Sequence, residues 1–120
     1  MLRSVLRSKI HRATVTDARV EYEGSITIDR DLMDAARLVQ FEKVLVANTA
    51  NGARVETYVM EGERGTGIIC MNGAAAHHAK IGDRLIIMAF CLVDEKELAA
   101  HRPVLIKVNE KNKIVGPARA

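Results

Sequence analysis

The stretch Arg19-Val20-Glu21-Tyr22-Glu23-Gly24-Ser25-Ile26-Thr27-Ile28-Asp29 decides how the chain is organised. Its two ends, residues 19–22 and 25–29, carry β-branched and aromatic residues typical of strands. The Glu-Gly-Ser connection between them is short and of the kind that reverses a chain. We therefore predict a hairpin with Gly24-Ser25 at its turn.

The Gly24-Ser25 bond also has a chemical interpretation. A serine hydroxyl can attack the preceding carbonyl and turn the amide into an ester, and glycine can adopt the strained backbone angles that bring the two groups together. If the ester eliminates instead of hydrolysing, Ser25 becomes dehydroalanine and then a pyruvoyl group. A plain turn is the alternative, because Gly-Ser is a common turn dipeptide. The rest of the chain must therefore decide between self-cleavage and a plain turn.

Short segments with strand composition make up most of the remaining chain. The further strands expected are residues 10–16, 43–48, 54–60, 68–71, 84–90 and 104–108. Asn51-Gly52 predicts a hairpin with a type I′ turn. Asp31–Leu38 is the clearest helix, residues 94–100 add one or two helical turns, and the chain from Lys111 onward is expected to be loose. This pattern predicts a mainly β fold, a small closed β-barrel with one or two short helices.

Length and composition restrict the classes of protein that fit. The chain has 120 residues, 48% of them hydrophobic and 28% charged, which predicts a single globular domain over residues 1–120. No apolar run is long enough to span a membrane, and the basic N-terminus lacks a signal-peptide pattern. The net charge of +3 permits an anionic ligand, but 3% aromatic residues provide no stacking platform for nucleic acid.

The cysteines and histidines predict neither a disulfide nor a metal site. Cys70 and Cys91 lie in apolar runs, so we expect buried, reduced thiols in a cytoplasmic protein. Their spacing matches no zinc motif. His77 and His78 are adjacent, and on a strand their rings would point to opposite faces.

A pyruvoyl ketone would need particular neighbours. It can bind a primary amine as a Schiff base and act as an electron sink for the loss of an α-carboxylate. The site then needs cations for carboxylates, a proton donor and neutral hydrogen-bond donors. Lys9 and Arg54 are the candidate cations, and Tyr58 is the candidate proton donor. The candidate neutral donors are Thr57, Asn72 and the backbone of residues 73–76. Each also has an ordinary alternative, as a solvated charge, a strand residue or part of a turn.

Several motifs occur together along the chain. They are Lys9-Ile10-His11-Arg12, Tyr22-Glu23-Gly24-Ser25-Ile26, Asn51-Gly52 followed by Arg54 and Thr57-Tyr58, Glu63-Arg64-Gly65, and Asn72-Gly73-Ala74-Ala75-Ala76-His77. In this order and spacing they resemble the pyruvoyl-dependent aspartate 1-decarboxylases. The resemblance covers residues 1–108, and the stretch from Asn109 matches nothing in that pattern.

The resemblance implies a double-psi β-barrel that assembles as a homotetramer and is made as an inactive proenzyme. Cleavage between Gly24 and Ser25 would give chains 1–24 and 25–120, the second beginning with a covalent pyruvoyl group derived from Ser25. The implied reaction converts L-aspartate to β-alanine and carbon dioxide through a Schiff base, and feeds pantothenate and coenzyme A synthesis. A helper protein for maturation is one further partner that the resemblance leaves open.

The resemblance also implies roles for individual residues. Ser25 and Tyr58 are catalytic, Tyr58 as the proton donor, and Gly24, Ser25 and Thr57 take part in self-cleavage. The implied substrate-binding residues are Lys9, Arg54, Thr57, Asn72, Gly73, Ala74 and Ala75. His11, Tyr22 and Ile86 are implied as neighbours of the site. Two cations match the two carboxylates of aspartate, and an arginine can bind one of them in bidentate fashion.

Two alternatives belong to other classes of function. Ile81-Gly82-Asp83-Arg84-Leu85-Ile86 resembles the Gly-Asp turn of small barrels that include bacterial DNA-binding regulators, so a binding module is one alternative. An inert relative with the fold but without self-cleavage is the other. Neither assigns a role to the Tyr-Glu-Gly-Ser and Asn-Gly-Ala-Ala-Ala-His motifs.

Overall fold

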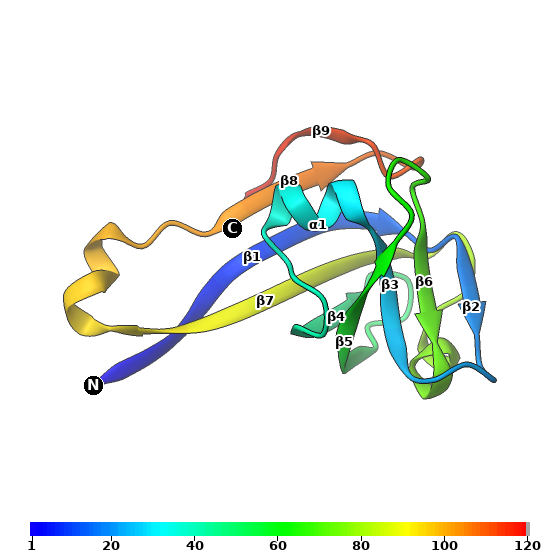
Figure 1. The fold of residues 1–120 in the computed structure, drawn as a ribbon, viewed down its shortest axis with the longest axis horizontal. Coiled ribbons are helices and arrows are strands. Elements are labelled where there is room, and N and C mark those ends of the chain that lie inside the picture. The colour runs from blue at the N-terminus through cyan, green and yellow to red at the C-terminus, as the bar shows by residue number, and fades with distance from the viewer. Residues whose placement is uncertain (120) are drawn as a thin grey trace.

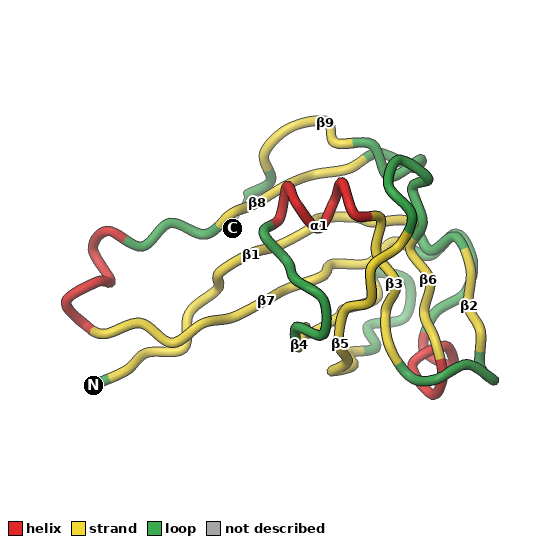
Figure 2. Tube along the Cα trace, viewed as in Figure 1, coloured by secondary structure: helices red, strands yellow, loops and turns green. Residues whose placement is uncertain are grey.

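The computed structural model describes residues 1–119, which fold into strands and three short helices (Figures 1 and 2). The strands are β1 (Leu2–Thr14), β2 (Asp17–Arg19), β3 (Ser25–Asp29), β4 (Lys43–Asn48), β5 (Arg54–Gly62), β6 (Ile69–Asn72), β7 (Arg84–Asp94), β8 (Val104–Val108) and β9 (Ile114–Pro117). The helices are α1 (Arg30–Ala36) and the 3₁₀ helices η1 (Gly73–His78) and η2 (Glu95–Ala100).

The strands pair into a closed barrel. Neighbours follow the order β2-β6-β3-β5-β4-β7-β1, with β8 and β9 added beyond β1. The ring closes because β1 leads directly into β2, and Thr16 between them donates its N–H to the Ile69 carbonyl of β6 at 2.8 Å. The predicted mainly β barrel is confirmed, and its parallel pairs, β3 with β5 and β2 with β6, fit the double-psi arrangement.

The core fills the barrel with branched side chains. Alternate residues of β4 are buried, as a strand with one buried face requires, and Ile26 and Ile28 of β3 point into the core. Helix α1 packs Leu32, Met33 and Ala36 onto this core. The largest fully buried side chains of the strands are Ile10, Ile26, Ile28, Val44, Val46, Ile69, Met71, Leu85 and Ile87. Each contributes about 1.5–3 kcal/mol through burial.

The hairpin predicted around Gly24-Ser25 is wrong. Strands β2 and β3 do not pair with each other, because β6 lies between them and pairs with both. Residues 20–24 therefore form a connection that passes the end of β6 (Figure 1). Insertion of β6 between β2 and β3 is favoured over a local hairpin, because β6 then buries Ile69 and Met71 in the core with both of its edges paired.

Other local predictions hold with changes. Asn51-Gly52 does join β4 to β5, but only Gly52 of the pair has a positive φ, so the turn is a longer loop and not type I′. Helix α1 ends at Ala36, before the predicted Leu38, because Arg37 takes a left-handed φ of 57°. Residues 73–78, which are not among the predicted helices, form the 3₁₀ helix η1.

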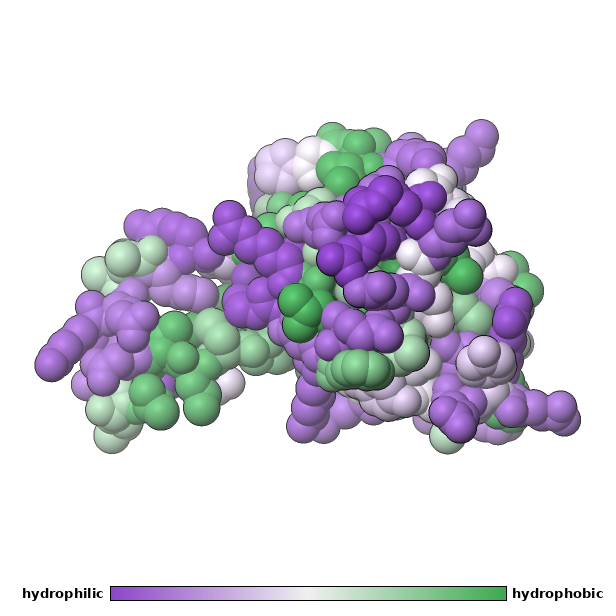
Figure 3. All heavy atoms as spheres, viewed as in Figure 1, coloured by the Kyte–Doolittle hydropathy of each residue, from purple (hydrophilic) through white to green (hydrophobic). Residues whose placement is uncertain are grey.

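Strands β1 and β7 extend beyond the barrel as a two-stranded arm. Their pairing runs from Thr14 with Arg84 to Leu2 with Asp94, and η2 follows at the tip (Figure 1). The arm exposes large apolar side chains, with Leu2 60%, Phe90 47% and Leu92 65% accessible, and Figure 3 shows apolar atoms gathered there. None of the helices in residues 1–119 is long and apolar enough to cross a membrane.

Asp29 anchors the end of β3 that leads into α1. Its carboxylate, 2% exposed, accepts the N–H of Asp31 at 2.8 Å, of Gly65 at 3.0 Å and of Gly67 at 2.8 Å. Burial opposes ionisation, but these three donors lower the pKa of Asp29 below its ordinary value. The carboxylate thereby caps α1 and holds the glycine-rich loop of residues 63–67 against β3.

The C-terminal segment is ordered, which corrects the expectation that it is loose. Strand β9 pairs with β8, and Asn112, 2% exposed, holds the segment from inside. The Asn112 side chain donates to the carbonyls of Thr14 at 2.8 Å and Gly67 at 2.7 Å, and accepts the Thr14 N–H at 2.7 Å. Buried amide bonds to backbone therefore replace the apolar contacts that this polar segment lacks.

We predict that Asp29→Ala lowers the free energy of unfolding by about 2–4 kcal/mol, because three backbone N–H groups lose a charged acceptor. Because the folded-state pKa of Asp29 is lowered, its contribution is present above the ordinary Asp pKa and is lost as pH falls through the folded value. Urea unfolding between pH 7 and pH 3 measures both effects. Asp31→Ala, which removes an exposed ion pair with Arg64, is the control and should cost under about 1 kcal/mol. Equal losses of unfolding free energy in the two variants would contradict the role of Asp29 as an anchor.

Candidate active site

Four polar side chains form a patch on the outer face of β3 and β6. In the antiparallel register Ser25 lies opposite Asn72, and Thr27 lies opposite Cys70. Residues two apart on a strand share a face, and directly opposed residues share it too. The intervening Ile26 and Met71 point into the core. The barrel register alone therefore brings Ser25, Thr27, Cys70 and Asn72 together.

The Asn72 carboxamide connects the patch. Its Nδ2 donates to Ser25 Oγ and to Thr27 Oγ1, both at 3.0 Å, and its Oδ1 accepts from Cys70 Sγ at 3.2 Å. Ser25 and Cys70 are each 3% exposed and Asn72 is 2% exposed. Burial raises the pKa of the Cys70 thiol, and Asp17 adds to the rise, so the thiol keeps its proton. The serine oxygen thus lies in a buried, hydrogen-bonded setting.

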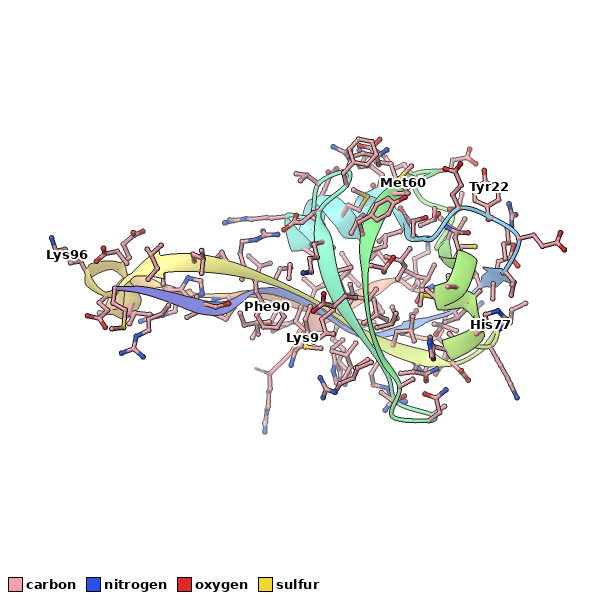
Figure 4. All side chains as sticks on the ribbon, turned by 90° about the horizontal axis from the view of Figure 1, so that it is seen from below. Lys9, Tyr22, Met60, His77, Phe90 and Lys96 are labelled. Carbon is pink, nitrogen blue, oxygen red and sulfur yellow. The ribbon has the colours of Figure 1, made fainter. Side chains whose placement is uncertain are left out.

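A cavity of about 290 Å³ opens over this patch. Tyr58 and Met60, two apart on β5, form one wall, and Tyr22 and Glu23 of the connection form another. Figure 4 shows Tyr22 and Met60 near each other at this end of the barrel. Arg19 contributes the one cationic group among the lining residues, ion-paired to Asp17 at 2.7 Å. The cavity has room for a small polar molecule.

A second cavity of about 330 Å³ lies on the other side of Tyr58. Gly24, Thr57, Ala74 and Ala75 line it together with Tyr58. The Gly24-Ser25 bond therefore joins residues that line different cavities, and Tyr58 lines both. Of the residues predicted for self-cleavage and catalysis, Gly24, Ser25, Thr57 and Tyr58 are brought together by the fold.

Gly73 packs tightly against the predicted cleavage point. Its φ is 65°, and a Cβ built there would lie 2.5 Å from Gly24 Cα and 2.7 Å from Gly24 N. The strain expected at Gly24 is not seen, since Gly24 is not among the residues with positive φ. The left-handed conformation belongs to Gly73 instead, and the missing side chain lets η1 approach the connection.

The predicted cations do not lie at this patch. Arg54, Ala47, Ile86 and His11 are successive cross-strand partners on β5, β4, β7 and β1, so they form one row on the outer surface. Lys9 lies two residues from His11 on the same face, and its Nζ donates to the Arg119 carbonyl at 2.6 Å. Figure 4 shows Lys9 near Phe90, where the arm leaves the barrel, away from Tyr22. Within one chain, Lys9, His11, Arg54 and Ile86 line neither cavity beside Ser25.

His11 belongs to that row and has a lowered pKa. Burial, followed by the charges of Lys9 and Arg12, lowers the pKa of His11 below its ordinary value. Its Nδ1 is buried without a partner among the described residues. The imidazole is therefore neutral at pH 7 and adds no charge to the row.

Sequence reasoning missed Thr27, Cys70, Met60 and Arg19 as residues beside Ser25. The spacing of Ser25 with Thr27, of Cys70 with Asn72 and of Tyr58 with Met60 places each pair on one face of a strand. The sequence therefore shows that each pair shares a face, but it does not show that β3 pairs with β6. The described residues contain no group of three or more His, Cys, Asp or Glu side chains that could hold a metal ion.

Comparisons with known proteins agree on one family. The family model described as aspartate decarboxylase matches residues 1–115. A protein of Caldicellulosiruptor saccharolyticus named aspartate 1-decarboxylase is 56% identical over 115 residues, covering 96% of this chain and 90% of the relative. Relatives of the same name from Clostridium acetobutylicum and Bacillus cereus are 56% and 50% identical, over 92% and 96% of this chain and 87% and 91% of their own lengths.

Among solved structures, the crystal structure of the computationally designed msDPBB_sym2 protein aligns with a TM-score of 0.44 and 18% identity. The alignment covers 72% of this chain and 98% of that protein.

We predict that Gly73→Ala lowers the free energy of unfolding by about 3 kcal/mol or more, because a left-handed φ costs about 1–2 kcal/mol for alanine and the new Cβ overlaps the backbone of Gly24. Gly82→Ala is the matched control, since Gly82 has a φ of 94° but nothing within 4 Å of the built Cβ. It should show the conformational cost alone, about 1–2 kcal/mol. Urea unfolding of both variants measures the two losses of free energy. Equal losses would show that the backbone at Gly24 moves aside without cost and would contradict the tight packing.

Proposed function

The chain belongs to the aspartate decarboxylase family, and on that premise we propose that it is a self-processing enzyme that converts L-aspartate to β-alanine and carbon dioxide. Its product would supply pantothenate and coenzyme A synthesis. The observation that carries the proposal is the position of Ser25: a buried hydroxyl that receives a hydrogen bond from Asn72 at 3.0 Å and lines a cavity next to Tyr58. No role follows for this buried patch if the protein is only a binding module.

Self-cleavage is the first reaction of the proposal. Ser25 Oγ adds to the Gly24 carbonyl carbon and loses its proton, while the Gly24–Ser25 C–N bond breaks and the amine takes up a proton. The resulting ester then loses the Ser25 α-proton, and its Cβ–O bond breaks, which releases Gly24 as a carboxylate. Water replaces the nitrogen of the dehydroalanine, ammonia leaves, and a pyruvoyl group remains at the start of residues 25–120.

The residues around Ser25 suit both the precursor and the group it would become. Asn72 Nδ2 donates to Ser25 Oγ, so the serine oxygen is held as an acceptor and its own O–H remains free to pass its proton to a base during attack. Thr57 lines the cavity that Gly24 also lines, so its hydroxyl is available to the Gly24 carbonyl. When formed, the pyruvoyl group supplies a carbonyl that binds the substrate amine and accepts electrons as the carboxylate departs.

The remaining roles belong to groups that line the two cavities. Tyr58 lines both, and we assign its hydroxyl as the donor that returns a proton to the substrate carbon. Asn72 and the backbone of Gly73, Ala74 and Ala75 would orient the substrate, since η1 brings them beside Gly24. Tyr22 lines the cavity over Ser25 and would help to exclude water from it.

The substrate cations require a second copy of the chain in this proposal. Lys9 lies on the outer row of β1, and Arg54 is four residues, about 13 Å, along β5 from Tyr58. In a homotetramer the row with Lys9, His11, Arg54 and Ile86 of one chain can face the Ser25 cavity of another. The exposed apolar residues of the arm, Leu2, Phe90 and Leu92, offer surface for that assembly.

We place the protein in the cytoplasm, because Cys70 and Cys91 are both free thiols and reduced cysteines suit that compartment. Cleavage can proceed by the chain's own groups or with a helper protein that orders the connection of residues 20–24. Under the proposal the whole of residues 1–120 forms one barrel domain before and after cleavage.

We expect denaturing mass spectrometry of the purified protein to find residues 1–24 and residues 25–120, the second with a ketone in place of its N-terminal amine. Ser25→Ala should give one uncut chain without decarboxylase activity, because the attacking oxygen is gone. Ser4→Ala, an exposed serine on the arm, is the control and should cut as the wild type does. A wild-type chain that stays intact on prolonged warming, alone and in cell extract, would refute self-processing.

We expect Tyr58→Phe to self-cleave at close to the wild-type rate and to lose turnover by about 10²–10⁴-fold, the usual contribution of a positioned proton donor. Cleavage is read by intact mass and turnover by carbon dioxide release from aspartate. Normal cleavage in the variant is the control that its fold and Ser25 are intact. Unchanged β-alanine production would contradict the assignment of Tyr58.

A further inference from the structure

The Cys70 thiol is the partner that distinguishes the two ends of the Asn72 carboxamide. Ser25 and Thr27 both meet Asn72 Nδ2 at 3.0 Å, and the thiol meets Oδ1 at 3.2 Å. We propose that Cys70 is a positioning residue for self-cleavage, which directs the Asn72 amide nitrogen at Ser25 Oγ through the S–H···Oδ1 hydrogen bond. The inference rests on the proposed function, because it concerns the reaction of Ser25.

The hydrogen bonds to the Ser25 and Thr27 hydroxyls do not fix the orientation of the Asn72 carboxamide. A hydroxyl can donate or accept, so Ser25 and Thr27 would bond equally well to the amide oxygen after a half-turn of the side chain. The thiol is different. While it carries its proton it is a donor, and as an acceptor for an amide N–H it is weak. Its one other acceptor is the Met71 carbonyl, at the longer distance of 3.9 Å. The observed orientation is therefore the one in which the thiol has its better bond.

Burial makes this preference strong. Cys70 and Asn72 are 3% and 2% exposed, so little solvent reaches the amide oxygen to replace a lost partner. An unpartnered polar atom inside a protein costs free energy that an exposed one does not. Burial also raises the pKa of the Cys70 thiol, which keeps the S–H donor present at neutral pH. Together these features hold the amide nitrogen toward β3.

The orientation matters because Ser25 Oγ must give up its proton as it attacks, and the charge of the addition then falls on the Gly24 carbonyl oxygen. With Nδ2 toward Ser25, the serine oxygen accepts the hydrogen bond, so its own O–H is free to pass its proton to a base. With the carboxamide turned, Oδ1 would accept the Ser25 O–H and hold the proton that the attack must release. The thiol does not touch the reacting atoms, so its effect passes entirely through Asn72.

The test measures the self-cleavage rate of the Cys70 variants by intact mass from freshly isolated precursor. Cys70→Ala removes the donor, and Cys70→Val replaces it with an apolar group that fills the space. Cys70→Ser keeps a donor at the same position. We expect Cys70→Ala and Cys70→Val to cleave at least about tenfold more slowly, and Cys70→Ser to stay within about threefold of the wild type. Cys91→Ala, which alters the other free thiol, should leave the rate unchanged.

The outcomes separate this inference from the function on which it rests. If the wild type never cleaves, self-processing itself is refuted. If the wild type cleaves and Cys70→Ala matches its rate, only the positioning role is overturned. Slowing by the same factor in Cys70→Ala and Cys70→Ser would also overturn it, because packing and not the donor would then be responsible. Urea unfolding of each Cys70 substitution in the uncut Ser25→Ala chain shows whether stability follows the same order as the cleavage rate. Restoration of the cleavage rate by serine is the result that a purely structural role of Cys70 does not produce.

Discussion

Strand β3 is hydrogen-bonded on both edges, in parallel to β5 and antiparallel to β6, and the geometry of the site depends on this double pairing. It fixes Ser25 opposite Asn72 and places Tyr58 of β5 on the other flank of the same surface. Because a shift of one residue would turn Ser25 into the core and Ile26 outward, the buried side chains of Ile26 and Ile28 hold the register. Core packing therefore positions the reactive residue.

The two ends of β3 use buried polar groups for different purposes. At Asp29 a carboxylate with a lowered pKa satisfies three backbone N–H groups, which stabilises the junction with α1 and the glycine-rich loop. At Ser25 the hydrogen bonds come from side chains, and they lead to an oxygen that can react. A fixed anchor at one end allows the other end to carry a reactive group and a connection that can be cut without loss of the barrel. The closed ring of strands holds residues 1–24 through β1, whose pairing with β7 and β8 does not involve the Gly24–Ser25 bond.

Under the proposed residue roles, a single chain holds only part of the site. Ser25, Thr57, Tyr58 and Asn72 line two adjoining cavities, while Lys9 and Arg54 belong to an outer row that starts on β5 and crosses β4 and β7 to β1. Arg54 is four residues along β5 from Tyr58, and Lys9 lies three strands away on β1. Under the proposed assembly, a second copy of the chain would unite the two sets, and the exposed apolar residues of the arm offer surface for it.

The sequence by itself determined the strand-rich fold and the Asn51-Gly52 connection, and it singled out Ser25, Thr57, Tyr58 and Asn72 as candidate site residues, because composition and ordered motifs are local properties of the chain. Only the tertiary structure decided that β6 separates β2 from β3, that the left-handed backbone conformation lies at Gly73 and not at Gly24, and that Thr27 and Cys70 complete the patch. The ordered C-terminal segment also came only from the fold, since Asn112 acts through carbonyls of Thr14 and Gly67. Strand register joins residues 25 and 72, and such long-range pairing is set by burial of the whole core. The Gly24-Ser25 stretch was thus predicted as the point of self-cleavage from the order of motifs along the chain, whereas its neighbours in space were chosen by the barrel.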